Sequence, residues 1–349
     1  MKKIPKNQII IFGTIVIFAV AAFGLMIYSG ARLLFATRPA GRAVTVAGKE
    51  CASFGKLDGA CLAKGEAEKY PVAVMIDNKK ESWPPAGLSY AGMVFEAPVE
   101  GGITRFLAIF TTDKEVKKIG PVRSIRPYYI DWAQEFGALM MHIGGSPEAL
   151  GIIASDADLM KRNIEGDGNY FWRAKDRIAP HNAYTSSKLL NDARSKKLQN
   201  QDLKFDSWEF KNDDFLSERE EGKELTVKFS NDPLYNAVWV YDKEKNEYRR
   251  KIGADYAKDE DGRMILAKNI AVVATDIEII DEVSRRRIAS VGNGDALVFL
   301  DGKKIEARWE KRDKENRLYF FYLNGEPVQF NRGVIWVEVV GDLGQVTEK

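Results

Sequence analysis

The chain has 349 residues, of which 45% are hydrophobic and 29% charged, and its formal net charge at pH 7 is +2. This composition excludes a mainly disordered chain, because so many apolar side chains can form sizeable cores. The near-balanced charge shows no sign of the clustered basic face that nucleic-acid binding requires, so no nucleic-acid partner is expected. The length predicts about two domains beyond the N-terminal segment.

Residues 1–35 are predicted to be a cytoplasmic start and a transmembrane anchor. Lys2, Lys3 and Lys6 precede residues 8–31, which carry no charge and are mostly Ile, Val, Phe, Ala and Leu. About twenty apolar residues span a bilayer as a helix, whereas a cleaved signal peptide has a shorter apolar region of roughly 7 to 15 residues. The basic start predicts a single-pass protein in the cell membrane with its body outside the cytoplasm.

Residues 36–69 are rich in Gly, Ala and Lys and show no periodicity, which predicts a flexible tether. The only two cysteines of the chain, Cys51 and Cys61, lie in it. In an oxidising compartment they would close a small disulfide loop, and the alternative is two free thiols. Their spacing fits no zinc pattern, so no metal site is expected there.

An α/β domain is predicted over residues 70–200. Apolar runs predict buried strands, and amphipathic segments that follow helix-capping residues predict helices. Ser146 before Pro147, for example, is typical of an N-cap followed by proline in the first helical turn. The expected strands are 72–76, 92–96, 104–110 and 138–142, and the expected helices are 127–136, 147–161 and 186–198.

A polar connector over residues 201–223 separates this domain from a β-rich domain over residues 224–349. The second domain shows short alternating strands, and the dipeptides Asp301–Gly302 and Asn324–Gly325 predict hairpin turns. The predicted fold class is therefore α+β: an α/β N-terminal domain, then a mostly antiparallel β C-terminal domain, with an N-terminal transmembrane helix.

The segment GPVRSIRP (120–127) carries the sharpest chemical signal. Its glycine and prolines bend the backbone, and Arg123 and Arg126 can converge on one anion if the segment is helical or a turn. Guanidinium groups bind carboxylate or phosphate through two parallel hydrogen bonds. The alternative is a structural network in which both arginines pair with Glu96 and Glu100.

The only two histidines, His142 and His181, lie in the same domain. They could hydrogen-bond a ligand or be buried and satisfied. A metal site would need both of them together with a carboxylate, and no HxH or HExxH spacing supports one. Ser146 could act as a nucleophile with a histidine base and Asp77, but capping the following helix also explains it.

No catalytic residue, cofactor or metal site is assigned from these patterns. The candidate ligand-binding residues are those at the strand ends and loops of the first domain, where binding residues commonly lie. They are Asp77, Asn78, Glu96, Glu100, Arg105, Arg123, Ser124, Arg126, His142, Ser146, Arg177, His181 and Asn182.

The chain resembles the YerB-like family of bacterial envelope proteins, a family of unknown function. The residues that carry the resemblance are PVAVMIDN (71–78), EGGITRF (100–106), IGPVRSIRPYYIDWA (119–133), HIGGSP (142–147), RIAPHNAYTS (177–186) and GVIWVEVV (333–340). The resemblance implies an extracytoplasmic protein with an α/β domain and a β-rich domain. Many members resemble lipoproteins with a cysteine directly after the signal peptide. Here Lys49 and Glu50 precede Cys51, which is no lipidation context, so the apolar helix is expected to be the anchor.

The leading hypothesis is a membrane-anchored, extracytoplasmic cell-envelope protein that binds an anionic wall component or a cell-wall synthesis partner. The alternative is an enzyme acting on wall glycan or peptide, with two of Asp77, Glu96 and Glu100 as acid and base. Such a pair must lie within about 5 to 10 Å in one cleft. A purely structural spacer would show no pocket joining Asp77, Arg123 and His142.

Overall fold

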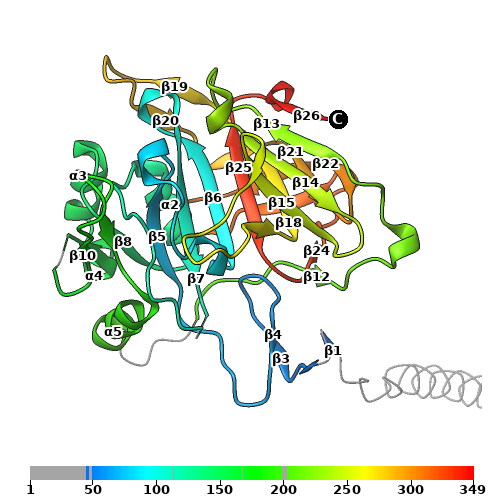
Figure 1. Cartoon of the computed structure of the whole chain (residues 1–349), viewed down its shortest axis with the longest axis horizontal. Coiled ribbons are helices and arrows are strands. Elements are labelled where there is room, and N and C mark those ends of the chain that lie inside the picture. The colour runs from blue at the N-terminus through cyan, green and yellow to red at the C-terminus, as the bar shows by residue number, and fades with distance from the viewer. Residues whose placement is uncertain (1–44, 47–48, 113, 167, 199–202) are drawn as a thin grey trace, which may run out of the picture. The chain divides into compact units, whose positions relative to one another are not determined.

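The structure, a computed structural model, describes residues 45–46, 49–112, 114–166, 168–198 and 203–349 (Figure 1). The chain divides into two units, Met1–Ala52 and Ser53–Lys349. In the first unit, β1 (Thr45–Val46) pairs with β2 (Lys49–Glu50). The transmembrane helix predicted over residues 8–31 lies outside the described residues. Within the described ranges, no helix is long and apolar enough to cross a membrane.

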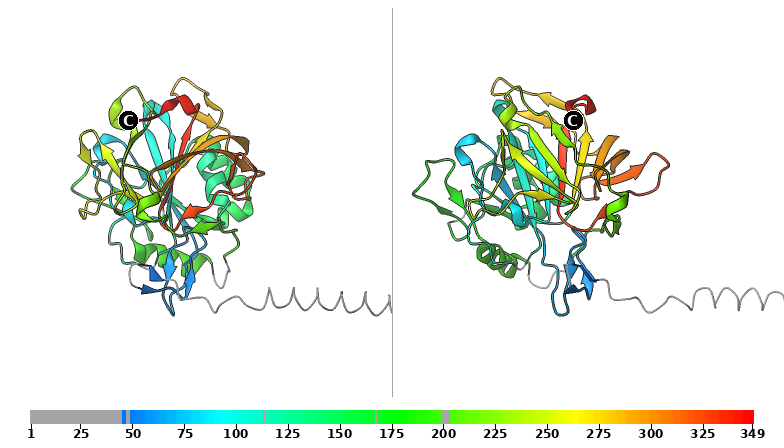
Figure 2. Two further views of the ribbon diagram at one scale, coloured as in Figure 1. Left: turned by 90° about the vertical axis from the view of Figure 1, so that its right-hand side faces the viewer. Right: turned by 45° about the vertical axis from the view of Figure 1, so that its right-hand side comes forward.

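A ten-stranded sheet forms the centre of the second unit, and its strands come from both halves of the chain (Figures 1 and 2). In the middle of the sheet, β6 (Met93–Pro98) pairs in parallel with β25 (Ile335–Val340). Beyond β25 follow β18 (Asn269–Ala274), β21 (Gly292–Leu300), β22 (Lys303–Lys311) and β23 (Tyr319–Tyr322). Beyond β6 follow β7 (Thr104–Phe110), β5 (Val72–Asp77), β8 (Leu139–His142) and β9 (Asn163–Glu165).

Strands β5, β6, β7 and β8 are buried along almost their whole length. Continuous apolar runs such as VAVMID suit strands that are covered on both faces. The four strands coincide closely with the strands expected at 72–76, 92–96, 104–110 and 138–142.

The α-helices are α2 (Pro127–Gln134), α3 (Pro147–Ser155), α4 (Ala157–Arg162) and α5 (Ser187–Lys197). The single helix expected over 147–161 is broken at Asp156, which has extended backbone. Its side chain accepts hydrogen bonds from the backbone nitrogens of Asp158 and Leu159, at 2.8 and 3.0 Å. Asp156 thus ends α3 and caps α4, because an aspartate side chain competes with the helical backbone for these donors.

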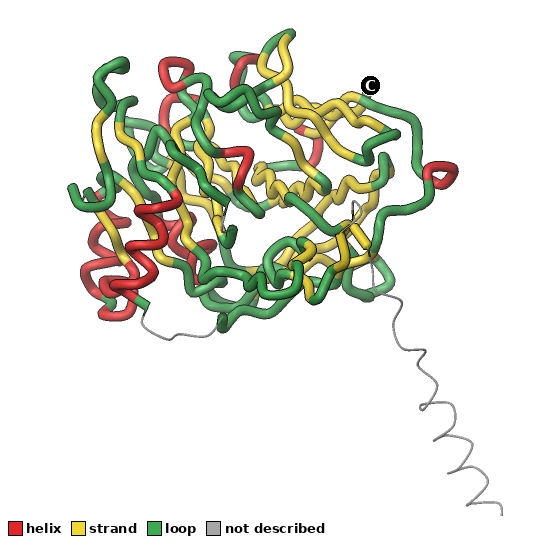
Figure 3. Tube along the Cα trace, turned by 60° about the horizontal axis from the view of Figure 1, so that its bottom comes forward, coloured by secondary structure: helices red, strands yellow, loops and turns green. Residues whose placement is uncertain are grey.

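The central sheet carries a hydrophobic cluster on each face. On one face, Met75 and Phe95 pack with α2, where the rings of Phe95 and Trp132 stack at 5.3 Å. On the other face, Val74 packs with Leu190 of α5 and, further along the sheet, with the strands of a second sheet. The strands that carry the candidate site are therefore held between two layers. Figure 3 shows the longer helices gathered at one side of this unit.

The second sheet has six strands and is antiparallel throughout: β13 (Glu224–Val227), β14 (Ala237–Asp242), β15 (Glu247–Ile252), β16 (Asp255–Tyr256), β17 (Leu266–Ala267) and β26 (Val346–Glu348). Burial alternates along β14, as expected for a sheet with one face against the core. The fold is thus mixed α and β, with a large β content.

Short elements complete the unit. Four small strand pairs are β3 (Ser53–Phe54) with β4 (Cys61–Leu62), β10 (Trp172–Arg173) with β11 (Ala183–Tyr184), β12 (Phe210–Lys211) with β24 (Phe330–Asn331), and β19 (Ile277–Ile279) with β20 (Arg286–Ile288). Single 3₁₀ turns span Lys80–Ser82, Leu88–Tyr90, Glu100–Gly102, Leu216–Glu218, Pro233–Tyr235 and Leu343–Gln345. Cys51 and Cys61 are both disulfide-bonded.

Candidate functional site

The candidate site lies where β5 ends and β7 begins. Asp77, the last residue of β5, is paired across the sheet with Arg105 of β7. The bent GPVRSIRP segment runs past this end and bonds to it, because the backbone nitrogen of Arg123 donates to the carbonyl of Met75 at 3.0 Å. Backbone pairing therefore places Arg123 against the end of β5.

One carboxylate oxygen contacts two of the candidate side chains. Asp77 is 1% exposed, and its Oδ2 lies 2.6 Å from His181 Nδ1 and 3.1 Å from Arg123 Nε. Because a carboxylate only accepts, His181 donates through Nδ1 and directs its Nε2 away from Asp77. That nitrogen accepts a hydrogen bond when the ring is neutral and donates one when the ring is protonated.

The Arg123 side chain is held by charge rather than by hydrogen bonds. Among the described residues it donates no hydrogen bond, and its Nε is buried without a well-aligned acceptor although Asp77 Oδ2 lies 3.1 Å away. Its side chain remains 22% exposed. A buried Nε without an acceptor is unusual, because buried donors of a guanidinium normally find acceptors.

Arg105 lies buried beside Arg123. It donates from Nη1 to the carbonyl of Ser124 at 2.6 Å, and its Nε has no hydrogen-bond partner in the described part of the chain. Burial, followed by the charges of Arg126 and Arg123, holds the pKa of the Arg105 guanidinium below its ordinary value, and Asp77 opposes this fall.

Arg126, in contrast, is fully engaged. Its Nε and Nη2 donate to the two oxygens of Glu100, at 2.6 and 2.7 Å, and its Nη1 donates to the carbonyl of Ile125 at 2.8 Å. Burial raises the pKa of Glu100, but the hydrogen bond and charge of Arg126 outweigh this and hold that pKa below its ordinary value. The pair closes one side of the site.

The charges around the site do not balance. Three guanidinium groups, those of Arg105, Arg123 and Arg126, face the two carboxylates of Asp77 and Glu100. One positive charge is left over, and protonation of the attached histidine would add a second. An anion bound here would relieve this repulsion.

Arg177 and Asn182 shape the loop that carries His181. Arg177 donates to the carbonyls of Ser82 and Pro84, at 2.5 and 2.8 Å. Asn182 accepts from the Arg173 side chain at 2.8 Å and donates to a backbone carbonyl of the same loop. These two candidates are engaged with protein groups, so they position His181 rather than offer themselves to a ligand.

His142 and Ser146 have their own partners outside this cluster. The ring nitrogens of His142 contact the carbonyl of Gly144 at 2.8 Å and the side chain of Asn163 at 2.7 Å, and burial lowers the pKa of His142. Ser146 caps α3 by accepting from Ala149 N at 3.2 Å. Ser124 likewise donates its hydroxyl to a backbone carbonyl. The capping role occupies the oxygen that a Ser146 nucleophile would need.

Glu96 and Asn78 belong to a buried network on the side facing the second sheet. Glu96 is 0% exposed and lies 2.8 Å from Arg250 Nη1, and Asn78 donates to Thr104 at 2.7 Å. Glu338, paired with Glu96 across β6 and β25, lies 3.6 Å from the same Arg250 nitrogen. Burial, then repulsion from Glu96, raises the pKa of Glu338 well above its ordinary value.

The sequence analysis did not identify Arg250 or Glu338. The guanidinium of Arg250 packs against the rings of Phe106, Trp239 and Trp336, at 5.4, 5.2 and 4.9 Å. The alternation of β15 held a signal, because Arg250 falls on the same face as the buried Tyr248, two residues earlier.

The contacts of the three acidic candidates bear on the enzyme alternative. Asp77, Glu96 and Glu100 each lie against a different arginine, namely Arg123, Arg250 and Arg126. None of the three therefore forms an acid–base pair with another in an open cleft. Among the described residues, no group of three or more His, Cys, Asp or Glu side chains could hold a metal ion.

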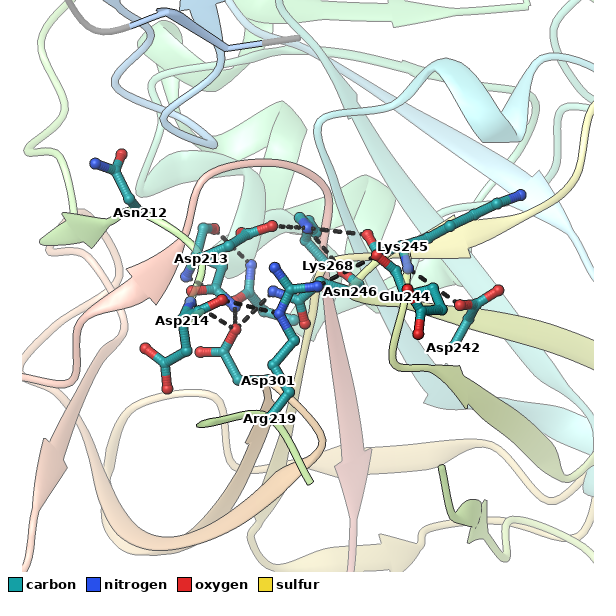
Figure 4. A network of polar contacts seen from close by, with 12 residues as sticks. Asn212, Asp213, Asp214, Arg219, Asp242, Glu244, Lys245, Asn246, Lys268 and Asp301 are labelled. Carbon is teal, nitrogen blue, oxygen red and sulfur yellow. Dashed lines mark hydrogen bonds and ion pairs between the residues drawn. The ribbon is translucent and has the colours of Figure 1, made fainter. Parts of the chain in front are cut away.

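A second polar network lies in the C-terminal half (Figure 4). Asp301, buried at the turn between β21 and β22, accepts from Lys211 Nζ at 2.5 Å and from Asn246 Nδ2 at 2.6 Å. Lys268 donates to Asp213 at 2.5 Å and to the Asn246 carbonyl at 2.7 Å. Its charged members pair with one another, so this network fastens the connector to the β-rich half.

Comparisons with known proteins agree over most of the chain. The family models "Protein of unknown function (DUF3048) N-terminal domain" and its C-terminal counterpart match residues 58–202 and 225–337. The "Putative lipoprotein YerB" of Bacillus subtilis (strain 168) is 33% identical over 278 residues, which cover 79% of this chain and 82% of that protein. The crystal structure of the YerB protein from Bacillus subtilis matches with a TM-score of 0.75 at 30% identity, covering 85% of this chain and 99% of that one.

Proposed function

The chain belongs to the DUF3048 family, and from that premise we propose that it is a membrane-anchored envelope protein whose body binds an anionic wall component outside the cytoplasm. Arg123 and His181 would bind the anionic group. The name of the Bacillus subtilis relative, a lipoprotein, supports a place in the envelope. The apolar run at residues 8–31 would take the role that a lipid has in a lipoprotein.

The two disulfide-bonded cysteines support the extracytoplasmic location of the body. Disulfides persist in oxidising compartments and are rare in the cytosol, where thiols are kept reduced. The basic N-terminal residues favour the same orientation, because positive charge is retained on the cytoplasmic side.

The shared oxygen of Asp77 is the observation that carries the binding proposal. Because the histidine and the guanidinium contact the same Oδ2, their ligand-facing nitrogens lie close enough to meet one carboxylate or phosphate. Arg123 Nε is buried without an acceptor, and the three arginines of the cluster outnumber its two carboxylates. Charge-assisted hydrogen bonds to such an anion are stronger than neutral ones.

The experiment is a binding titration with the body, residues 45–349, which retains both cysteines. The probes are a glycerol-phosphate polymer and muramyl peptides, which present phosphate and carboxylate groups respectively. Arg123→Gln should lower the affinity about 10- to 100-fold, since hydrogen bonds to charged groups contribute about 1.5–3 kcal/mol.

Arg287→Gln is the matched control, since the Arg287 side chain is 65% exposed and lies outside the cluster. Equal losses in the Arg123 and Arg287 variants would indicate nonspecific charge attraction and contradict the proposed site. Saturable binding that the folded Arg123 variant retains in full would also contradict it.

A further inference from the structure

A second basic surface lies away from Asp77, between α2, α4 and α5. A cavity of about 540 Å³ opens there, and its cationic lining residues are Lys161, Arg162, Lys196, Lys197 and Lys204. We call these five residues and the cavity between them the basic hollow. Its lysines are exposed, and none of them belongs to the proposed anion site.

The acidic residues around the basic hollow leave most of its charge unneutralised. Asp158 pairs with Lys161 at 3.3 Å. Glu135 is turned into the protein, where it meets Arg317 at 2.9 Å and Lys311 at 3.4 Å. The other four cations of the hollow pair with no carboxylate among the described residues, and Glu315 is the remaining acid of its lining.

A helix end accounts for only part of this charge. Lys196 and Lys197 lie in the last turn of α5, where cations complement the helix dipole. Lys161 and Arg162 lie in the last turn of α4 in the same way, whereas Lys204, from the chain beyond α5, has no such role. Three separate segments thus bring positive charge to one hollow.

The hollow lies beside the place where the chain enters the body. Tyr70, two residues before β5, lines it, and the Arg194 side chain of α5 donates to the Tyr70 carbonyl at 2.7 Å. Helix α5 and the β3–β4 pair, with which the second unit begins, lie at the same end of that unit in Figures 1 and 2. The basic hollow therefore lies at the end of the second unit where the chain of that unit begins.

We propose that the basic hollow docks on the anionic lipid headgroups of the membrane to which the chain is tethered. From the proposed function, this inference takes only the membrane anchor and its tether, and not the anion site. About twenty residues separate the predicted membrane helix from Ser53, and even fully extended they reach about 75 Å at most. A leaflet held that close acts as a high local concentration of anions, and each cation brought to it favours contact by about fivefold.

Docking would fix the orientation of the body. With the basic hollow on the lipid, the body would stand on the membrane by the end formed by α5 and the β3–β4 pair, rather than turn freely on its tether. Because the attraction is electrostatic and near the surface, it falls off within a Debye length and weakens with salt.

The test is lysine labelling of the full chain in nanodiscs, read by mass spectrometry. One set of nanodiscs contains phosphatidylcholine alone and the other contains three parts phosphatidylcholine to one part phosphatidylglycerol. Labelling of Lys161, Lys196, Lys197 and Lys204 should be at least fivefold slower on the anionic discs at low salt, and equal on both at 0.5 M salt. Equal labelling on both discs at low salt would overturn the proposal.

Matched variants distinguish protection caused by the basic hollow from a general effect of positive charge on the protein surface. Lys196→Gln, Lys197→Gln and Lys204→Gln together should abolish the lipid-dependent protection of Lys161. The control triple Lys228→Gln, Lys258→Gln and Lys304→Gln, made at exposed positions elsewhere, should leave it unchanged. Loss of protection in the control triple would overturn the assignment to the basic hollow.

Two further arms distinguish the remaining outcomes. If a soluble glycerol-phosphate polymer protects these lysines on neutral discs while anionic lipid does not, the surface binds a polymer and the lipid proposal is wrong. Arg123→Gln should leave the lipid-dependent protection intact, so a failed anion site and a failed hollow give different results. A full chain that does not enter discs of either composition would contradict the proposed anchor instead.

Discussion

Arg123 and Arg126 are three residues apart, yet their surroundings give them different roles. The sequence analysis weighed a ligand grip against a structural network for both arginines together. In the structure, Arg126 makes the network contact, with two hydrogen bonds to Glu100, while the Arg123 side chain donates none among the described residues. Sequence spacing could not separate the two, because the partners arrive from elements that the spacing does not place.

Replacing each arginine by alanine should therefore affect stability differently. Arg126→Ala leaves Glu100 partly buried without its partner, so the free energy of unfolding should fall by roughly 1–3 kcal/mol, less than for a fully buried pair. Arg123→Ala should cost under about 1 kcal/mol, since the Arg123 side chain donates no hydrogen bond and Asp77 keeps its contact with His181 at 2.6 Å. Urea denaturation followed by tryptophan fluorescence measures both. A larger loss for Arg123 than for Arg126 would reverse these roles.

His181 shows what the sequence can and cannot predict for a single residue. The sequence identified both histidines as candidates but could not choose between them. Burial and two ring contacts occupy His142, whereas His181 meets Asp77 from 104 residues away. Local sequence patterns do not encode contacts over such separations, and only the fold brings these two side chains together.

At the scale of elements, the parallel pair of β6 and β25 contains a buried carboxyl group, that of Glu338, whose pKa is raised. Glu96 and Glu338 lie side by side in this pair and share Arg250. The raised pKa of Glu338 means that the folded protein binds a proton that the unfolded chain releases near its ordinary pKa. Stability from this group is therefore greatest at low pH and falls as the pH rises toward the folded pKa.

Glu338→Gln should remove that fall, because the amide resembles the protonated carboxyl and can still accept from Trp239 Nε1, which lies 3.0 Å from Glu338 Oε1. We expect the variant to be at least as stable as the parent at pH 8 and to show a flatter dependence of Tm on pH between 5 and 8. Differential scanning calorimetry measures this. The control Glu96→Gln removes the closest counter-charge of Arg250 and should lower Tm. An unchanged slope in Glu338→Gln would contradict a protonated Glu338.

The elements themselves were largely predictable, and the exceptions have physical causes. Buried strands such as β5 can be recognised in the sequence as continuous apolar runs, and Ser146 indicated the start of α3. The break at Asp156 was not predicted, because the apolar periodicity continues across this capping residue and hides the end of α3. The buried charges of β15 and β25 were missed because an arginine or a glutamate inside a strand is normally assigned to the exposed face.

At the scale of the whole molecule, the two family domains share one sheet. The N-terminal domain model ends at residue 202 and the C-terminal one begins at residue 225, yet β6 and β25 pair directly. The sequence predicted two segments of different composition and could not predict their junction, because parallel neighbours can come from any distance along the chain.

The body should therefore unfold as one unit. Residues 45–349 are expected to give a single transition in urea, with coincident midpoints from tryptophan fluorescence and far-UV circular dichroism. A fragment that ends at residue 202 should lack a cooperative transition, because it exposes the edge of β6 and the apolar face that the second sheet covers. Two separate transitions, or a cooperatively folded fragment, would show that the domains are independent.

The pairing of β6 with β25 also imposes an order on how the protein can be made. β25 begins about 240 residues after β6, so a chain that emerges N-terminus first presents β6 with one open edge for most of its synthesis or export. An unpaired, apolar strand edge readily accepts a strand from another chain. The central sheet can close only after the last strands have been made. Until then, the open edge of β6 must be covered by something other than β25.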